Sequence, residues 1–539
     1  MSTSVGQVMM LPAPASAYET TEELAATIQE RCRQPINSLQ IAALLESAGI
    51  TDAIAQRRYG YQDVFALAEW VRQDLRPATT PELAPATLPP DNARERISDF
   101  ARGPLTMGPI LFLSFIIMSY QEFGQWQNQQ VLLLGLAMLS SLLVTSGFVQ
   151  AASRKGSGYL SQGYVRAAGR IVGLILGLSL LMVLLLAGVG TAVLLLTGWL
   201  PLNDIALLVV AYITLSCLWL VAAVLFLLQQ VYWYGLGLGV GVGLSYLTLR
   251  VGARYPLPLQ QVLLLATVMG LSGLLLTTAW ISWRAFRQRA LASHVGQQRI
   301  ILPTSRHLTV NLAPYFCYGV LYVLLIIVGH VPGWLGRVED GVQMVAVSTT
   351  EVGLTLALGG YILVGGVAEH TMRRFWKRVK AYQERTPGEK PELFNQNLGR
   401  FFRREQRVYL QALVFCTGLV LGVTLLLVAW LARLGRDPLG WTPATLTTFV
   451  LGLVGYGVMA WGIFNCMFMI TLSRPGKAIT AVSIAILITL AIGLPTSRLL
   501  GYHYSGIGMV AGSLAFTLFS ARQLRQLWTR ADYYYYASF

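Results

Sequence analysis

Long apolar runs constrain the fold of this chain more than any other feature of its sequence. A helix needs about 20 apolar residues to cross the roughly 30 Å of hydrocarbon in a bilayer. The sequence predicts twelve such runs, at 104–122, 129–152, 168–198, 203–228, 231–249, 257–282, 311–330, 350–372, 408–432, 444–471, 475–494 and 503–523. Only 12% of the residues are charged, too few to solvate so much apolar volume. We therefore predict an all-α polytopic membrane protein.

The boundary between the fourth and fifth runs is the weakest part of this prediction. Only Gln229 and Gln230 separate the two runs. If the pair lay inside one broken element, the count would fall to eleven and the C-terminus would change side.

The positions of the charges support twelve spans. The net charge is +15, yet residues 1–91 hold six Lys and Arg against eleven Asp and Glu. With a cytoplasmic N-terminus, the inner loops and flanks carry 28 Lys and Arg and the outer loops carry six. Basic residues concentrate on the cytoplasmic side of membrane proteins. The charge therefore indicates topology, with both termini in the cytoplasm, and gives no reason to expect a nucleic-acid partner.

The spans divide into two sets of six. Residues 1–92 are predicted to form a small acidic helical region in the cytosol, ending in a proline-rich tether. Residues 93–302 are predicted to form a first six-helix bundle with an inner linker loop. Residues 303–539 are predicted to form a second bundle with a C-terminal tail.

No catalytic signature is present. The sequence contains no GxxxxGK[ST] loop, no HExxH and no GxSxG, and its five cysteines are far apart without metal-ligand spacing. The outer loops are too short to house much chemistry. We therefore expect a protein that is not an enzyme and needs no cofactor or metal.

A glycine run lies inside the fifth span. In a helix, Gly235, Gly239 and Gly243 fall on one face and Gly237 and Gly241 on a second, which is a tandem small-xxx-small pattern. This pattern predicts close packing of a neighbouring helix, and a bendable helix that takes part in gating is the alternative.

Polar residues at membrane depth are candidates for a substrate pathway, because each must be paired or hydrated. Glu122 and Glu351 lie at the outer ends of spans one and eight, where they are either pathway residues or solvated interface residues. Glu369 lies at the inner end of span eight, where pairing with the arginines that follow is an alternative. The candidate pathway residues are Tyr120, Glu122, Asn311, Tyr315, Tyr318, Glu351 and Glu369.

The inner loop after span eight mixes basic and aromatic residues. This mixture favours an amphipathic helix lying on anionic headgroups, and docking of a cytosolic partner is the alternative. Its candidate contact residues are Arg373, Arg374, Lys377, Arg378, Arg403 and Arg404.

Three stretches carry a resemblance to a known family. They are APYFCYGVLYVLLIIVGHV at 313–331, EVGLTLALGGYILVGGVAEHTMRRFWKRV at 351–379 and FNQNLGRFFRREQRVYLQALVF at 394–415. They resemble the second half of the Pel exopolysaccharide exporter, a family of the multidrug/oligosaccharidyl-lipid/polysaccharide (MOP) flippase superfamily. In layout the resemblance covers residues 100–525, and the first ninety residues depart from the compact family pattern.

The resemblance implies a function and a set of partners. It implies two pseudo-symmetric six-helix bundles around a cavity that opens alternately to each side of a bacterial cytoplasmic membrane. The implied substrate is an amino-sugar polymer or its lipid-linked precursor, and the implied partners are a cytosolic glycosyltransferase and other membrane subunits of the synthase. The alternatives are a small-molecule or lipid-precursor flippase of the same superfamily, and a non-transporting subunit of a synthase complex.

Overall fold

The structure is a computed structural model of the chain. It describes residues 21, 23–25, 28, 38–47, 50–74, 93–106, 128–161, 164–252, 254–255, 259–292, 305–335, 349–385, 391–434 and 441–536. Every regular element in these residues is helical. The helices are α2 (Ser38–Ser47), α3 (Asp52–Tyr59), α4 (Val64–Asp74), α5 (Ala93–Thr106), α7 (Asn128–Ser161), α8 (Val165–Thr197), α9 (Leu202–Leu227), α10 (Val231–Gly252), α11 (Leu259–Ala292), α12 (Ser305–Val328), α13 (Val331–Trp334), α14 (Thr349–Arg385), α15 (Pro391–Arg433), α16 (Pro443–Thr471), α17 (Pro475–Leu499), η3 (Tyr502–Tyr504), α18 (Gly506–Trp528) and α19 (Ala531–Tyr536).

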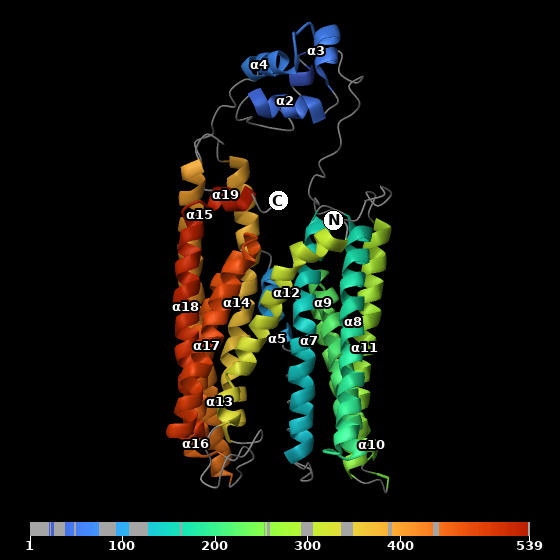
Figure 1. The fold of residues 1–539 in the computed structure, drawn as a ribbon, viewed down its shortest axis with the longest axis vertical. Helices are drawn as coiled ribbons and strands as arrows, with labels where there is room; N and C mark the ends of the chain where they lie inside the picture. Colours follow the sequence, from blue (N-terminus) through green and yellow to red (C-terminus); the bar gives the residue numbers. More distant parts are fainter. Residues whose placement is uncertain are drawn as a thin grey trace. The chain divides into compact units, whose positions relative to one another are not determined.

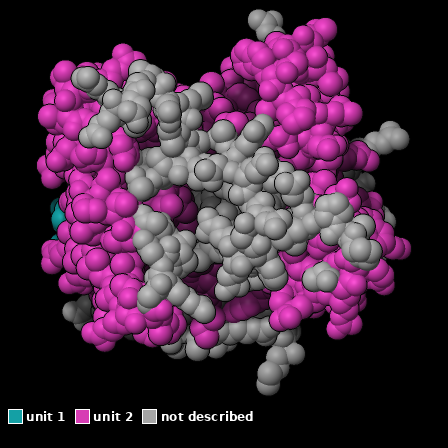
Figure 2. All heavy atoms as spheres, turned by 90° about the horizontal axis from the view of Figure 1, so that it is seen from below, with its two compact units in different colours: residues 1–90, 374–403, 530–533 teal, residues 91–373, 404–529, 534–539 magenta. Residues whose placement is uncertain are grey.

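The chain divides into two compact units. The first contains residues 1–90, 374–403 and 530–533, and the second contains residues 91–373, 404–529 and 534–539. In the end-on view of Figure 2, nearly all of the described atoms belong to the second unit. The candidate site and most of the spanning helices are in this second unit, while residues 374–385 of α14 and 391–403 of α15 belong to the first.

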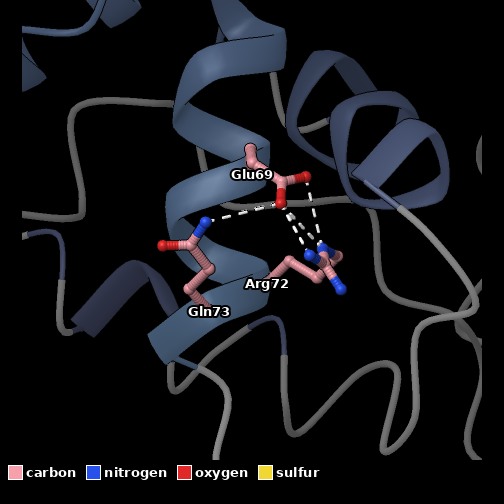
Figure 3. A network of polar contacts seen from close by, with 3 residues as sticks. All are labelled: Glu69, Arg72 and Gln73. Carbon is pink, nitrogen blue, oxygen red and sulfur yellow. Dashed lines mark hydrogen bonds and ion pairs between the residues drawn. The ribbon is translucent and has the colours of Figure 1, made fainter.

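The N-terminal helices of the first unit have a hydrophobic core of their own. Ile41, Leu45, Ile50, Leu67 and Val71 are almost completely buried in it. On the exposed face of α4, Glu69 accepts hydrogen bonds from Arg72 and Gln73 (Figure 3). Because this network is in water, it contributes little to stability. The predicted helical character of this region is confirmed by α2, α3 and α4.

Eleven helices in the described residues are long and apolar enough to cross a membrane, as expected for a multi-pass membrane protein. They match eleven of the twelve predicted spans. The remaining one, 104–122, is described only as far as residue 106, where α5 ends. The fourth and fifth spans are separate helices, α9 and α10.

The spanning helices of the second unit form two groups (Figure 1). Helices α7 to α11 pack on one another, and α16, α17 and α18 form the core of the other group, which also holds α14 and α15. Helix α12 contacts both α7 and α17, so it lies at the seam between the two groups. We call these groups the first and second bundles.

Two tight turns show the internal repeat at the level of the backbone. Gln229 joins α9 to α10 and Ser473 joins α16 to α17, with φ of 58° and 56°. In the first turn the amide of Gln230 donates to the carbonyl of Leu225 at 2.9 Å, and in the second that of Arg474 donates to Met469 at 2.8 Å. Both are Schellman-type helix ends. We call the end of the bundles that carries these turns the near face, and the opposite end the far face.

Candidate functional site: a cavity between the bundles

A cavity of about 450 Å³ lies between the two bundles. The first bundle lines it with residues of α7 and α9, including Gln150 and Trp219. The second bundle lines it with residues of α12, α14, α15 and α16. Its volume is in the range of small-molecule binding sites, which commonly occur at such boundaries.

Tyrosines of the second bundle give the cavity its chemical character. The hydroxyl groups of Tyr322 and Tyr361 hydrogen-bond to each other, and the ring of Tyr318 stacks on that of Tyr322. Tyr409 stacks on Phe464 with ring centroids 4.1 Å apart and donates to the carbonyl of Ala460. The wall therefore offers aromatic faces and hydroxyl groups together.

One carboxylate lines the cavity. Glu369 on α14 is the only charged side chain among the lining residues that the structure describes. The remaining polar groups, such as the Gln150 amide, are neutral. Such a site can hold a neutral ring by stacking and hydrogen bonding.

A buried aspartate ties α5 to α14 near this cavity. Asp99 is 2% exposed, its Oδ1 lies 2.7 Å from Nη2 of Arg373, and its Oδ2 lies 3.1 Å from Nδ1 of His370. The ring of Phe100 stacks on the His370 imidazole. Both of the aspartate's oxygens therefore have charged or polar partners on one turn of α14.

Glycines allow the same two helices to approach closely. A Cβ on Gly103 would lie 2.1 Å from the backbone nitrogen of Gly366, and a Cβ on Gly366 would lie 2.3 Å from the carbonyl oxygen of Phe100. No side chain fits at either position, so the backbones of α5 and α14 are in contact. Gly103 also lines the cavity, so this contact closes part of its wall.

The bundles also meet through α7 and α12. Phe148 packs edge-on against Phe316, and a Cβ on Gly319 would lie 2.7 Å from the carbonyl oxygen of Ser146. At the near face, Arg154 of α7 donates to the Ser473 hydroxyl in the α16–α17 turn. Its guanidinium also lies over the Tyr315 ring, at 5.5 Å. These contacts hold the near half of the seam together.

A second polar cluster lies at the far face of the second bundle. Nδ1 of His330 lies 3.1 Å from both carboxylate oxygens of Glu351, and its Nε2 lies 3.0 Å from the Tyr456 hydroxyl. The indole N–H of Trp334 donates to Glu351 at 2.6 Å. The cluster thus joins α13, α14 and α16 through one imidazole and one carboxylate.

His330 lies in the turn between the spans 309–328 and 351–379. Burial lowers the pKa of its imidazole, but the adjacent Glu351 carboxylate outweighs burial, so the pKa lies above its ordinary value. This ring is therefore positioned to change its charge in response to pH.

The predicted pathway residues separate in the structure. Tyr318 and Glu369 line the cavity, whereas Glu351 is in the far-face cluster and is not a lining residue. Tyr315 contacts Arg154 at the near face. Asn311 is exposed. The predictions for Tyr120 and Glu122 fall outside the described residues.

Of the two predicted glycine faces of α10, the face with Gly235, Gly239 and Gly243 makes no close contact with the described residues. A Cβ on Gly239 or Gly243 would meet nothing within 4 Å, and one on Gly235 would meet only Leu105 at 3.7 Å. The close contact is at Gly237, where a Cβ would lie 2.8 Å from Thr278 of α11. The close packing is therefore on the second of the two predicted faces, at Gly237.

The basic segment after span eight is helical on both sides of its short connection. Arg373, Arg374, Lys377 and Arg378 belong to α14, while Arg403 and Arg404 belong to α15. In the first unit the aromatic side chains of the two helices pack on each other: Phe375 lies 6.4 Å from Phe401, and Arg378 lies over the Phe401 ring. The two helices form a hairpin whose aromatic residues pack on each other, and the contact of its basic residues with headgroups or a partner stays a prediction.

Sequence reasoning did not identify several residues of the site. Tyr322 and Tyr361 lie within apolar spans, where the sequence pattern predicts that a tyrosine is a core residue. The spacing of Tyr318 and Tyr322, four residues apart on one helix face, was a usable signal. Asp99 and His330 stand at the edges of spans, and their partners on other helices are invisible to the sequence pattern.

The described helices have the fold of MATE transporters. A Vibrio cholerae MATE transporter in the bent form is 14% identical over 82% of this chain and 100% of that chain, with a TM-score of 0.57. An outward-facing multidrug resistance MATE family transporter of the MOP superfamily is 13% identical over 81% of this chain and 95% of that chain, with a TM-score of 0.55. No protein-family model and no curated protein matches the sequence.

Proposed function

We propose that this protein is a membrane transporter of the MOP type that exports an exopolysaccharide, or its lipid-linked precursor, by alternating access. The observation that carries the proposal is the tyrosine-rich cavity between the two bundles. A sugar presents hydroxyl groups that need hydrogen-bond partners when they leave water, and a flat apolar face that stacks on aromatic rings. The cavity offers both. The resemblance of residues 313–415 to the Pel exporter supports the same substrate class.

An export assay with cavity variants tests this proposal. In cells that depend on this protein, Tyr361→Phe removes one cavity hydroxyl group and Tyr361→Ala removes the ring as well. We expect the amount of extracellular polymer to fall several-fold for the first variant and further for the second. Tyr246→Phe is the matched control, because Tyr246 is on the exposed side of α10 and outside the cavity. Unchanged export by Tyr361→Ala would reject the proposal.

Two carboxylates are proposed to act in the transport cycle. Glu351 is held by the His330 imidazole at the far face, and a carboxylate–imidazole pair can carry a proton. Glu122 is proposed for the same end of the pathway on the basis of its sequence position. Glu351→Gln and Glu122→Gln should each lower export while the protein still inserts. Normal export by both variants would remove these residues from the pathway.

The second candidate is a small-molecule flippase. The size of the cavity favours it, because about 450 Å³ accommodates a drug-sized molecule. Fluorescent lipophilic cations and short oligosaccharides, tested for uptake into inverted vesicles, separate the two candidates. Transport of the cations alone would favour the small-molecule flippase.

The proposed location is the bacterial cytoplasmic membrane, with both termini in the cytoplasm. A cytosolic glycosyltransferase and other synthase subunits are the proposed partners, and the acidic N-terminal helices are the proposed contact. Deletion of residues 1–90 should abolish co-purification with the glycosyltransferase while the spanning part stays folded. Accessibility of an introduced N-terminal cysteine to a membrane-impermeant reagent tests the orientation.

A further inference from the structure

Three basic residues gather at the near-face end of the seam between the bundles. Arg154 of α7 reaches across to Ser473, and Arg474 is the next residue of that turn. Arg474 and Lys477 lie over the same ring, that of Tyr534, at 4.9 Å and 5.9 Å. All three basic residues are partly buried. We call them the seam cations.

The seam cations have no carboxylate partner within 4.0 Å among the described residues. The ion pairs in this part of the chain are formed by other residues, such as Arg373 with Asp99. Partly buried like charges that gather without a counter-ion are costly in free energy. An anion bound from outside the chain would lower this cost.

The N-terminus of α17 adds to the positive electrostatic potential around the seam cations. This helix is 25 residues long, begins at Pro475, and has no side-chain hydrogen bond at its N-cap, Arg474. Its N-terminus carries a partial positive charge and backbone N–H groups that point outward. A Cβ on Gly476, in its first turn, would meet nothing within 4 Å, so there is open space beside these groups. Helix ends of this kind hold phosphate groups in many proteins.

The repeated turn in the first bundle provides an internal control. The α9–α10 turn has the same backbone geometry, with Gln229 in the place of Ser473 and Gln230 in the place of Arg474. Trp233 stands where Lys477 stands. The geometry of the turn therefore does not require the basic residues, which are peculiar to the second bundle.

The seam cations adjoin the cavity. Arg154 lies one helical turn beyond Gln150, and Arg474 lies three residues beyond Thr471, both of which line the cavity. An anionic group bound here would therefore lie at the near-face end of the cavity. The nearest lining residues are neutral, so they do not compete for the cations.

We propose that Arg154, Arg474 and Lys477 form a binding site for an organic phosphate at the near-face end of the seam. A phosphodiester or diphosphate matches the site, because it brings several acceptor oxygens and more than one negative charge to three cations. The phosphate belongs either to a lipid headgroup or lipid carrier, or to a soluble molecule. With a lipid carrier as the source of the phosphate, the inference rests on the proposed function; with a headgroup or a soluble molecule, it goes beyond that function.

The test measures thermal unfolding of the full-length protein in an uncharged, phosphate-free detergent. Inorganic pyrophosphate, phosphatidylglycerol and a polyprenyl diphosphate are titrated separately, because a ligand that binds only the folded state raises Tm as its concentration increases. We expect at least one of them to raise the Tm of the wild-type protein. In the double variant Arg474→Gln/Lys477→Gln the apparent affinity should fall about tenfold or more. Arg498→Gln, which removes one positive charge at the exposed far end of α17 and so matches Lys477→Gln alone, should respond as the wild type does.

Each outcome decides the proposal. A response to pyrophosphate supports a soluble phosphate, a response only to phosphatidylglycerol supports a headgroup, and a response only to the polyprenyl diphosphate supports a lipid carrier. No rise of Tm with any probe, or an equal rise in the double variant, would overturn the site. If the double variant does not fold, Lys477→Gln alone must show a weaker response than Arg498→Gln. Normal polymer export by a protein that lacks the phosphate response would separate this inference from the proposed function.

Discussion

Asp99 of α5 lies 2.7 Å from Arg373 of α14, although 274 residues separate them in the chain. The aspartate is almost fully buried, whereas the Arg373 side chain is 24% exposed. The pair joins the helix that leads into the first bundle to a helix of the second bundle. Under the proposed alternating access, this contact would have to break when the near face opens.

Removing the charge of Asp99 should weaken this contact. We expect Asp99→Asn to lower the free energy of unfolding by roughly 1–3 kcal/mol, because Arg373 loses a charged partner beside a buried position. The effects of Asp99→Asn and Arg373→Gln should not add in the double variant. Thermal unfolding measures both. Glu69→Gln, in the exposed network of Figure 3, is the control and should cause no measurable change.

The contact between α5 and α14 should not tolerate a methyl group. Gly366→Ala places a Cβ 2.3 Å from the carbonyl oxygen of Phe100, so the helices must separate. We expect a cost of about 1–3 kcal/mol and a near face that is more accessible to cysteine reagents. Gly173→Ala, on α8 with open space around it, should be neutral or stabilising. Equal behaviour of the two variants would contradict the close backbone contact.

Helix α10 allows a comparison within one helix. Gly237→Ala should destabilise the first bundle, since its Cβ would lie 2.8 Å from Thr278, whose branched side chain has little freedom to move. Gly239→Ala has open space and should stabilise the protein by about 0.5–1 kcal/mol, because alanine favours the helix. The thermal midpoints of the two variants show which of the two glycines is in close contact with a neighbouring helix. A lower thermal midpoint for Gly239→Ala than for Gly237→Ala would show that the face with Gly239 is the packed one.

The far-face cluster should make stability depend on pH. Because the folded state raises the pKa of His330, the stabilisation is fully present below the unfolded pKa of about 6.5 and is lost as the pH rises through the higher folded pKa. Tm measured from about pH 5 to about pH 9 should therefore fall more steeply for the wild type than for His330→Gln. Glu351→Gln should flatten the curve in the same way. A wild-type slope in both variants would show that the pair is not the source.

The pattern of apolar runs predicted the spans well, but it could not show which polar residues of different helices lie together. Eleven predicted spans coincide with helices, and Gln229 and Gln230 do mark a boundary between two of them. Helix α15 begins 17 residues before its predicted span at 408, because its charged and aromatic first half packs on α14. Of the predicted pathway residues that the structure describes, only Tyr318 and Glu369 line the cavity.

The sequence by itself determined that this chain spans a membrane many times and where its helices lie, because the length of an apolar run and the bias of the basic residues are local properties. Only the tertiary structure decided which helix faces meet. In lipid, the face toward the bilayer is as apolar as the face toward the core, so periodicity cannot separate Gly237 from Gly239. For the same reason, the partnership of Asp99 with Arg373 and the gathering of the tyrosines came only from the packing of helices far apart in the chain.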